Sequence, residues 1–131
     1  MAKTKRQFWV AVVEDDAGMR EALQALLEAA GFPTSGYGSA EAFLRSARAR
    51  AAGCILVDMH LPGMSGLQFY RGLRARGPAP PGILLTAHRD GDGRLQAEAK
   101  AAGMSGVLYK PFTAEALLQL LRPISARHRT T

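Results

Sequence analysis

Several short apolar runs of the chain are each followed directly by, or end in, reactive polar residues. In chain order, these run-ending residues are Glu14, Asp15 and Asp16, then Asp58, Thr86 and Lys110. Carboxylates that are crowded together repel one another and stay ionised only beside a cation. Oxygen ligands without a His or Cys ligand pattern suit a hard ion, with Mg²⁺ favoured and Mn²⁺ as its substitute. A hydroxyl and an ammonium beside such an ion make a site for a phosphoryl group.

Each of these residue types also has an ordinary structural explanation. Three acidic residues after a strand could cap the next helix, because carboxylates favour helix N-termini. An aspartate after a strand is often a turn residue, and a single threonine or lysine there carries little information. Only their joint occurrence favours a phosphoryl site. The chain has no G-x-x-x-x-G-K-[ST] or G-x-G-x-x-G loop, so a nucleotide site is not expected.

Five short apolar runs alternate with amphipathic segments along the chain. The runs predict strands at residues 8–13, 33–37, 54–57, 83–86 and 107–109. The segments predict helices at residues 19–30, 40–47, 66–76, 92–102 and 114–121, with Ser39 and Thr113 as caps and Pro123 ending the last. This alternation indicates an α/β fold, a parallel sheet with helices on both faces, whose sites lie at the carboxyl ends of the strands. The second run is the most polar, so its strand is expected at an edge.

Length and composition point to one ordinary globular domain. The chain has 131 residues, of which 47% are hydrophobic and 21% are charged. Cys54 is the only cysteine, which fits a reducing compartment. The apolar runs are much shorter than the ~20 residues of a membrane span, and residues 1–7 lack the apolar part of a secretory signal. We therefore expect a cytoplasmic protein that does not enter a membrane.

The positive net charge of the chain is concentrated near its two ends. The formal charge is +6, from 17 basic and 11 acidic residues. Six of the basic residues flank the region between the first and last apolar runs, namely Lys3, Lys5, Arg6, Arg122, Arg127 and Arg129. The remaining basic residues equal the acidic ones in number. This distribution favours solvated tails, so direct nucleic-acid binding is not expected.

Four motifs together resemble the receiver domain of two-component response regulators. They are Val12-Val13-Glu14-Asp15-Asp16, Val57-Asp58-Met59-His60-Leu61-Pro62-Gly63-Met64-Ser65-Gly66, Leu85-Thr86-Ala87 and Tyr109-Lys110-Pro111-Phe112. The sequence within and around these motifs is similar to that of receivers of the FixJ type. The resemblance implies a flavodoxin-like, doubly wound (βα)5 sheet with strand order 2-1-3-4-5, forming a single domain over residues 8–122. Residues 1–7 and 123–131 would then be a basic N-terminal tail and a C-terminal tail.

The resemblance also implies roles for individual residues of the acidic group. Asp58 would be the phosphoacceptor, which takes its phosphoryl group from a phosphohistidine. Asp15, Asp58 and the backbone carbonyl of His60 would bind Mg²⁺, or Mn²⁺, directly. Glu14 would hold the metal through a water molecule. An aspartate is more usual at that position, but glutamate is a common variant.

Further residues would contact or surround the phosphoryl group. Thr86, with the adjacent Ala87, would bind a phosphoryl oxygen and change position on activation, and Lys110 would pair with the phosphoryl charge. The Lys110–Pro111 peptide is often cis in this family. His60 and His88 occupy positions that tune how fast water removes the phosphoryl group, although both could equally be plain surface loop residues.

One position departs from the pattern of the family. Receivers usually carry an aromatic residue three positions before the lysine, as the partner of the moving threonine, and here that residue is Val107. Tyr109 is expected on the opposite side of the strand and so not to replace it. Coupling between phosphorylation and the output face is therefore expected to be weak.

The leading hypothesis is a switch, not an enzyme, with slow self-dephosphorylation as its only catalysis. Its expected partners are a sensor histidine kinase or a phosphotransfer protein, and an output domain or protein at the fourth helix, fifth strand and fifth helix. It is expected to be a monomer or weak dimer. Three alternatives stay open: a receiver-fold binding module with impaired switching, the excised receiver of a DNA-binding transcriptional regulator, and a small-molecule enzyme such as a flavin protein.

Overall fold

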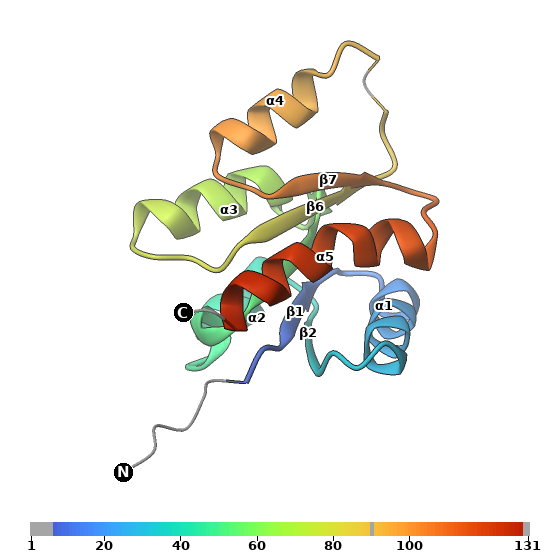
Figure 1. The fold of residues 1–131 in the computed structure, drawn as a ribbon. Helices are drawn as coiled ribbons and strands as arrows, with labels where there is room; N and C mark the ends of the chain where they lie inside the picture. The colour runs from blue at the N-terminus through green and yellow to red at the C-terminus, as the bar shows by residue number, and fades with distance from the viewer. Residues whose placement is uncertain (1–6, 90, 130–131) are drawn as a thin grey trace.

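Five parallel strands form the centre of the molecule in a computed structural model that describes residues 7–89 and 91–129 (Figure 1). The strands are β1 (Val10–Val13), β2 (Thr34–Tyr37), β3 (Cys54–Asp58), β6 (Gly82–Thr86) and β7 (Gly106–Tyr109). They lie in the order β2-β1-β3-β6-β7, which in order of strand position is the predicted 2-1-3-4-5 arrangement. The polar β2 lies at an edge, as its sequence indicated.

Helices cover both faces of the sheet. They are α1 (Ala17–Ala29), α2 (Ala40–Arg45), α3 (Gly66–Ala75), α4 (Arg94–Ala101) and α5 (Ala114–Arg129), with a short 3-10 helix, η1 (Ala49–Ala51). The predicted cap Ser39 accepts a hydrogen bond from the Ala42 N–H, and Thr113 Oγ1 accepts one from the Ala116 N–H, both at 3.0 Å. These bonds satisfy N–H groups that have no partner within the helix.

The core consists of two apolar layers, one on each face of the sheet. Successive residues of a strand point to opposite faces. In β1, Val10 and Val12 therefore pack with α1 and α5, whereas Ala11 and Val13 pack with α2, α3 and α4. Cys54, at the start of the central strand β3, is fully buried in the layer under α1 and α5.

The last helix is longer than predicted. Pro123 lies inside α5 and does not end it, so that prediction was wrong, and the expected boundary between residues 122 and 123 falls within a helix. A proline in a helix interior costs about 3 kcal/mol. Ile124 is only 5% exposed and packs in the same apolar layer as Leu121. Burial of the helix face beyond the proline offsets this cost.

Two further differences from the prediction are local. Helix α2 ends at Arg45, so Ala47 lies outside it, and Leu44 is 45% exposed. A two-stranded antiparallel hairpin, β4 (His60–Leu61) with β5 (Met64–Ser65), was not predicted and directly follows β3. Lys3, Lys5 and Arg6 lie outside the described residues.

Candidate functional site

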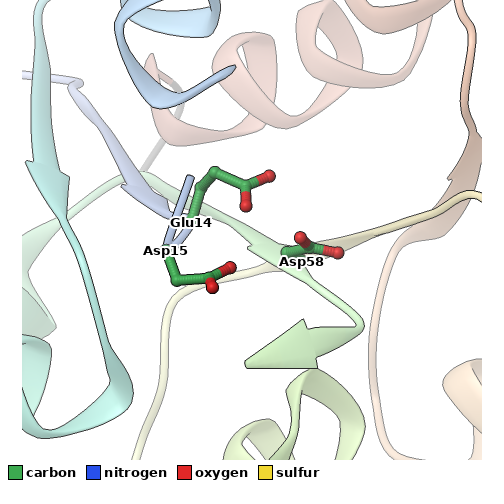
Figure 2. A group of neighbouring side chains, drawn as sticks. All are labelled: Glu14, Asp15 and Asp58. Carbon is green, nitrogen blue, oxygen red and sulfur yellow. The ribbon is translucent and has the colours of Figure 1, made fainter. Parts of the chain in front are cut away.

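Three carboxylates converge at the carboxyl edge of the sheet (Figure 2). Glu14 and Asp15 directly follow β1, and Asp58 is the last residue of the neighbouring strand β3. The two strands pair in parallel with Val13 opposite Val57, which brings the next residues of both strands together. One oxygen of each carboxylate lies within 4.8 Å of the others. Glu14 and Asp58 are buried, whereas Asp15 is exposed.

Lys110 lies between the two buried carboxylates. Its Nζ atom is 3.2 Å from Glu14 Oε1 and 3.4 Å from Asp58 Oδ2. The backbone N–H of Lys110 donates to the Thr86 carbonyl at 2.7 Å, which fixes the end of β7 beside β6. The Lys110–Pro111 peptide is cis, as the resemblance to receivers implied. The structure thus brings together the acidic residues and the lysine predicted to share a site.

The proximity of the carboxylates changes their proton affinity. Burial, a side-chain hydrogen bond with Asp58 and the charge of Asp58 together raise the pKa of Glu14 from 4.5 to about 7. Hydrogen bonds from the Asp16 N–H and from Lys110 Nζ act in the opposite direction. Burial alone would lower the pKa of Lys110, but the attraction of Asp58 and Glu14 outweighs it and raises that pKa. One ammonium therefore faces three acidic groups. The oxygen-only donor set and its excess of negative charge fit a divalent hard cation.

The backbone around Asp58 is held tightly. Asp58 Oδ1 accepts a hydrogen bond from the His60 N–H at 3.2 Å. The Gly66 N–H, at the start of α3, donates to the Met59 carbonyl at 2.7 Å. A Cβ atom on Gly66 would lie 2.2 Å from the Asp58 carbonyl oxygen, so only glycine allows this approach. The hairpin β4–β5 and α3 therefore position the Asp58 carboxylate.

Two residues that support the site were not predicted. The importance of Gly66 was missed, although a glycine at the first position of a helix is a usable signal for a close approach. Arg20, on α1, donates from Nη1 to the Glu14 carbonyl at 2.8 Å. Nothing in the sequence spacing distinguishes this arginine from the other basic residues of the chain.

Thr86 and the two histidines lie beside the acidic cluster, on the side of α4. Thr86 is fully buried, and its Oγ1 accepts a hydrogen bond from the His88 N–H at 3.1 Å. Asp58 pairs with Leu85, so Thr86 stands one residue farther along β6 than the residue opposite Asp58. The side chains of His60 and His88 are exposed and line, with Thr86, a pocket of ≈ 340 Å³. Ala87 is exposed in the same loop.

The region of Val107 differs from expectation in one respect. Val107 is half-buried against the apolar layer under α4. Residues two apart in a strand share a face, so Tyr109 lies on the same side as Val107, and the predicted opposite placement was wrong. Tyr109 pairs with Thr86 in the sheet, and the Arg89 guanidinium lies 5.3 Å from the centroid of its ring. An aromatic residue is thus present beside Thr86, but two residues farther along β7 than the position that is usually aromatic.

The chain combines a parallel five-stranded sheet with carboxylates and a lysine at its carboxyl edge, as expected for a phosphoacceptor signalling domain. The family model for the response regulator receiver domain matches residues 10–122. The chain belongs to this family, whose members are phosphoacceptor switches that bind Mg²⁺ at an acidic pocket.

Known relatives support the resemblance to FixJ-type receivers. The chain is 39% identical over 113 residues to the transcriptional regulatory protein FixJ of Azorhizobium caulinodans, covering 86% of this chain and 53% of that protein. It is 37% identical over 120 residues to the C4-dicarboxylate transport transcriptional regulatory protein DctD of Rhizobium meliloti, covering 92% of this chain and 26% of that protein. The chain thus spans about half, or less, of the length of these relatives.

Solved structures agree with the fold. The FixJ-N crystal structure superposes with a TM-score of 0.80 at 27% identity, covering 92% of this chain and 94% of that one. A response regulator receiver domain protein from Clostridium thermocellum gives a TM-score of 0.82 at 25% identity, covering 94% and 98%. Across residues 7–89 and 91–129, no helix combines the length and apolarity needed to cross a membrane.

Proposed function

We propose that Asp58 is the phosphoacceptor of this receiver and takes its phosphoryl group from a phosphohistidine on a sensor histidine kinase or phosphotransfer protein. An Asp58 carboxylate oxygen forms the new bond to phosphorus as the bond between phosphorus and the imidazole nitrogen breaks. The observation that carries this proposal is the position of Asp58. It is buried at the end of the central strand, 3.4 Å from Lys110 Nζ and grouped with two further carboxylates.

The other site residues stabilise charge on the transferred group. Asp15, Asp58 and the His60 carbonyl are the proposed direct ligands of Mg²⁺, or Mn²⁺, and Glu14 acts through a water molecule. A divalent ion held by these residues would supply positive charge to the phosphoryl oxygens. Lys110 already lies beside Asp58 and offers an ammonium to the same oxygens.

Thr86, Ala87, His60 and His88 are proposed to act after transfer. The Thr86 hydroxyl, which now accepts from the His88 N–H, would bind a phosphoryl oxygen and draw the β6–α4 loop with the adjacent Ala87 toward Asp58. His60 and His88 line the pocket beside Thr86 and would control the access of water to the acyl phosphate. The His60→Ala, His88→Ala double variant should then change the rate of phosphoryl loss, and an unchanged rate would leave both as surface residues only.

The test of the phosphoacceptor uses acetyl phosphate and Mg²⁺ with intact-mass detection. The wild type should gain one phosphoryl group, and Asp58→Asn should gain none. Asp16→Asn is the matched control, since Asp16 Oδ1 accepts from the Met19 N–H as the cap of α1, and asparagine can cap equally well. Phosphorylation of Asp58→Asn to the same extent as the wild type would refute the assignment.

Downstream, we propose that α4, β7 and α5 form the face read by an output domain or partner protein. On this proposal the chain works in the cytoplasm as a monomer or weak dimer, with slow self-dephosphorylation as its only catalysis and no direct contact with nucleic acid. The folded domain would extend from residue 8 to the end of α5. Val107 favours one alternative, a receiver-fold module whose switching is impaired.

A further inference from the structure

A second pocket, of ≈ 350 Å³, lies at the edge of the sheet opposite the acidic cluster. Gly53, Pro81 and Ser105 line it, and they directly precede β3, β6 and β7. Its other walls come from η1 and from the last turns of α5, whose C-terminal end lies near the segment after α2 in Figure 1. Asp58 and Lys110 stand at the carboxyl ends of the same sheet. The pocket is therefore separate from the proposed phosphorylation site.

Three nitrogen-bearing side chains from distant parts of the chain line this pocket. Arg50 comes from η1, and Arg127 and His128 come from the end of α5. Among the described residues that line the pocket there is no aspartate or glutamate. Arg50 Nη1 donates to the Pro78 carbonyl at 2.6 Å, and Nη2 donates to the Leu73 carbonyl at 3.1 Å. These neutral acceptors fix the guanidinium without neutralising its charge.

The proline-rich wall of the pocket has few acceptors to offer a ligand. The Pro78 carbonyl is bound to an arginine, as described above. The Pro80 carbonyl accepts from the Tyr70 hydroxyl at 2.7 Å, and the Pro81 carbonyl accepts from the Ile55 N–H at 2.8 Å. Proline has no N–H of its own. A bound group therefore meets mainly the N–H donors of the two arginines, which favours an anionic acceptor.

The remaining lining is apolar. Ala52 and Ile124 are 7% and 5% exposed, and Pro80 is buried. The volume is at the lower end of the ~300–1,000 Å³ that small-molecule sites occupy. A compact apolar body can contact these side chains while an anionic group faces the arginines.

From this combination we infer that the pocket binds a small organic anion, a carboxylate or phosphate on a compact apolar body. The cationic side chains supply the charge for the head group, and the apolar wall supplies contact area for the body. Because Arg127 comes from α5 and Arg50 from η1, a bound anion would link the end of α5 to η1. This binding is independent of the phosphorylation of Asp58.

The experiment titrates the whole chain with phenyl phosphate and with benzoate, followed by amide NMR shifts. Both probes carry one aromatic body, and benzyl alcohol is the uncharged control. Saturable shifts of the Gly53 and Ser105 amides with either anion, and none with the alcohol, are expected. The anion that saturates at lower concentration identifies the preferred head group. Absence of saturable shifts with both anions, or equal binding of benzyl alcohol, would overturn the inference.

A pair of arginine variants tests the location of the site. Arg127→Gln should weaken binding by about tenfold, the loss expected for one charge-assisted hydrogen bond. Arg122→Gln makes the same charge change on α5 outside the pocket and should bind as the wild type does. Asp58→Asn should also bind normally, which separates this inference from the proposed function. Equal weakening by the two arginine variants, when both retain the wild-type circular dichroism, would show only general attraction to a basic surface.

Discussion

Asp15 is the one exposed member of a carboxylate cluster whose other two members are buried. Its side chain is thus free to approach an ion entering from solvent, while Glu14 and Asp58 are held by Lys110. An ion that binds only the folded state stabilises it by RT ln(1 + [L]/Kd), about 2.7 kcal/mol at a hundredfold excess over Kd. We therefore expect Mg²⁺ to raise the Tm of the wild type and not that of Asp15→Asn.

The same residue should act differently without metal. Asp15→Asn removes a like-charge repulsion, so in chelator it should melt at or above the temperature of the wild type. Asp16→Asn should keep the Mg²⁺-dependent rise in Tm, because Asp16 lies outside the carboxylate group. If Mg²⁺ raises the Tm of Asp15→Asn as much as that of the wild type, Asp15 is not a ligand of the metal.

Glu14 makes the stability of the metal-free protein depend on pH. Its pKa rises from an ordinary 4.5 to about 7 on folding, chiefly because of burial. Between these values the folded chain holds more protons than the unfolded chain, so the free energy of unfolding falls as pH rises. The contribution is complete below the unfolded pKa and is lost above about pH 7. In chelator, the drop in Tm from about pH 5 to about pH 8 should be smaller for Glu14→Gln than for the wild type.

Glu21→Gln is the matched control for that measurement, since it makes the same charge change on the exposed side of α1. It should leave the pH-dependent drop in Tm as it is in the wild type. Identical drops in the wild type and Glu14→Gln would mean that the Glu14 carboxyl keeps its ordinary proton affinity in the fold.

At the scale of single elements, the strands and their end residues could be predicted because they follow from patterns local to each run. Continuous apolar runs identify buried parallel strands, and a parallel sheet brings their carboxyl ends to one edge. That reasoning alone placed Asp58 near Lys110. The length of α5 could not be predicted in this way. Pro123 is a strong local stop signal, and only the burial of Ile124 against other elements overrides it.

The hairpin after β3 and the hydrogen bond from Arg20 also could not be predicted from the sequence. Each strand of the hairpin has only two residues, too few for an alternating pattern. Arg20 lies in the first turn of α1, and its side chain reaches back to the Glu14 carbonyl six residues earlier in the chain. Both features are local contacts that leave no periodic trace in the sequence.

The β6–α4 segment should respond only weakly to phosphorylation. Val107 fills less of the space beside Thr86 than an aromatic side chain would, and Tyr109 on the same face is already covered by Arg89. A beryllofluoride phosphoryl mimic with Mg²⁺ should therefore cause only small changes in hydrogen exchange across α4. Val107→Phe should enlarge them, whereas Val107→Ile should not. Large, cooperative protection changes in the wild type would show that Val107 does not limit coupling.

In the described residues, part of the charge is distributed along the direction of the strands. Acidic residues collect at the carboxyl edge of the sheet, in the cluster around Asp58 and in the first turns of α2 and α5. Basic residues occupy the last turns of α2, α3 and α4. This arrangement complements the helix dipoles, which favour negative groups at N-termini and positive groups at C-termini. The proposed metal and phosphoryl site and the proposed anion pocket thus lie at opposite edges of the sheet.

The burial of Cys54 turns the protein's single thiol into a reporter of unfolding. Cys54 is fully buried in the central strand, and burial raises its pKa to about 12, so almost no thiolate forms in the folded state. A thiol reagent can therefore modify it only when the sheet opens. We expect the modification rate of the native protein to fall when Mg²⁺ is added, and Asp15→Asn to show no such slowing. Rapid modification under native conditions would mean that β3 opens without global unfolding.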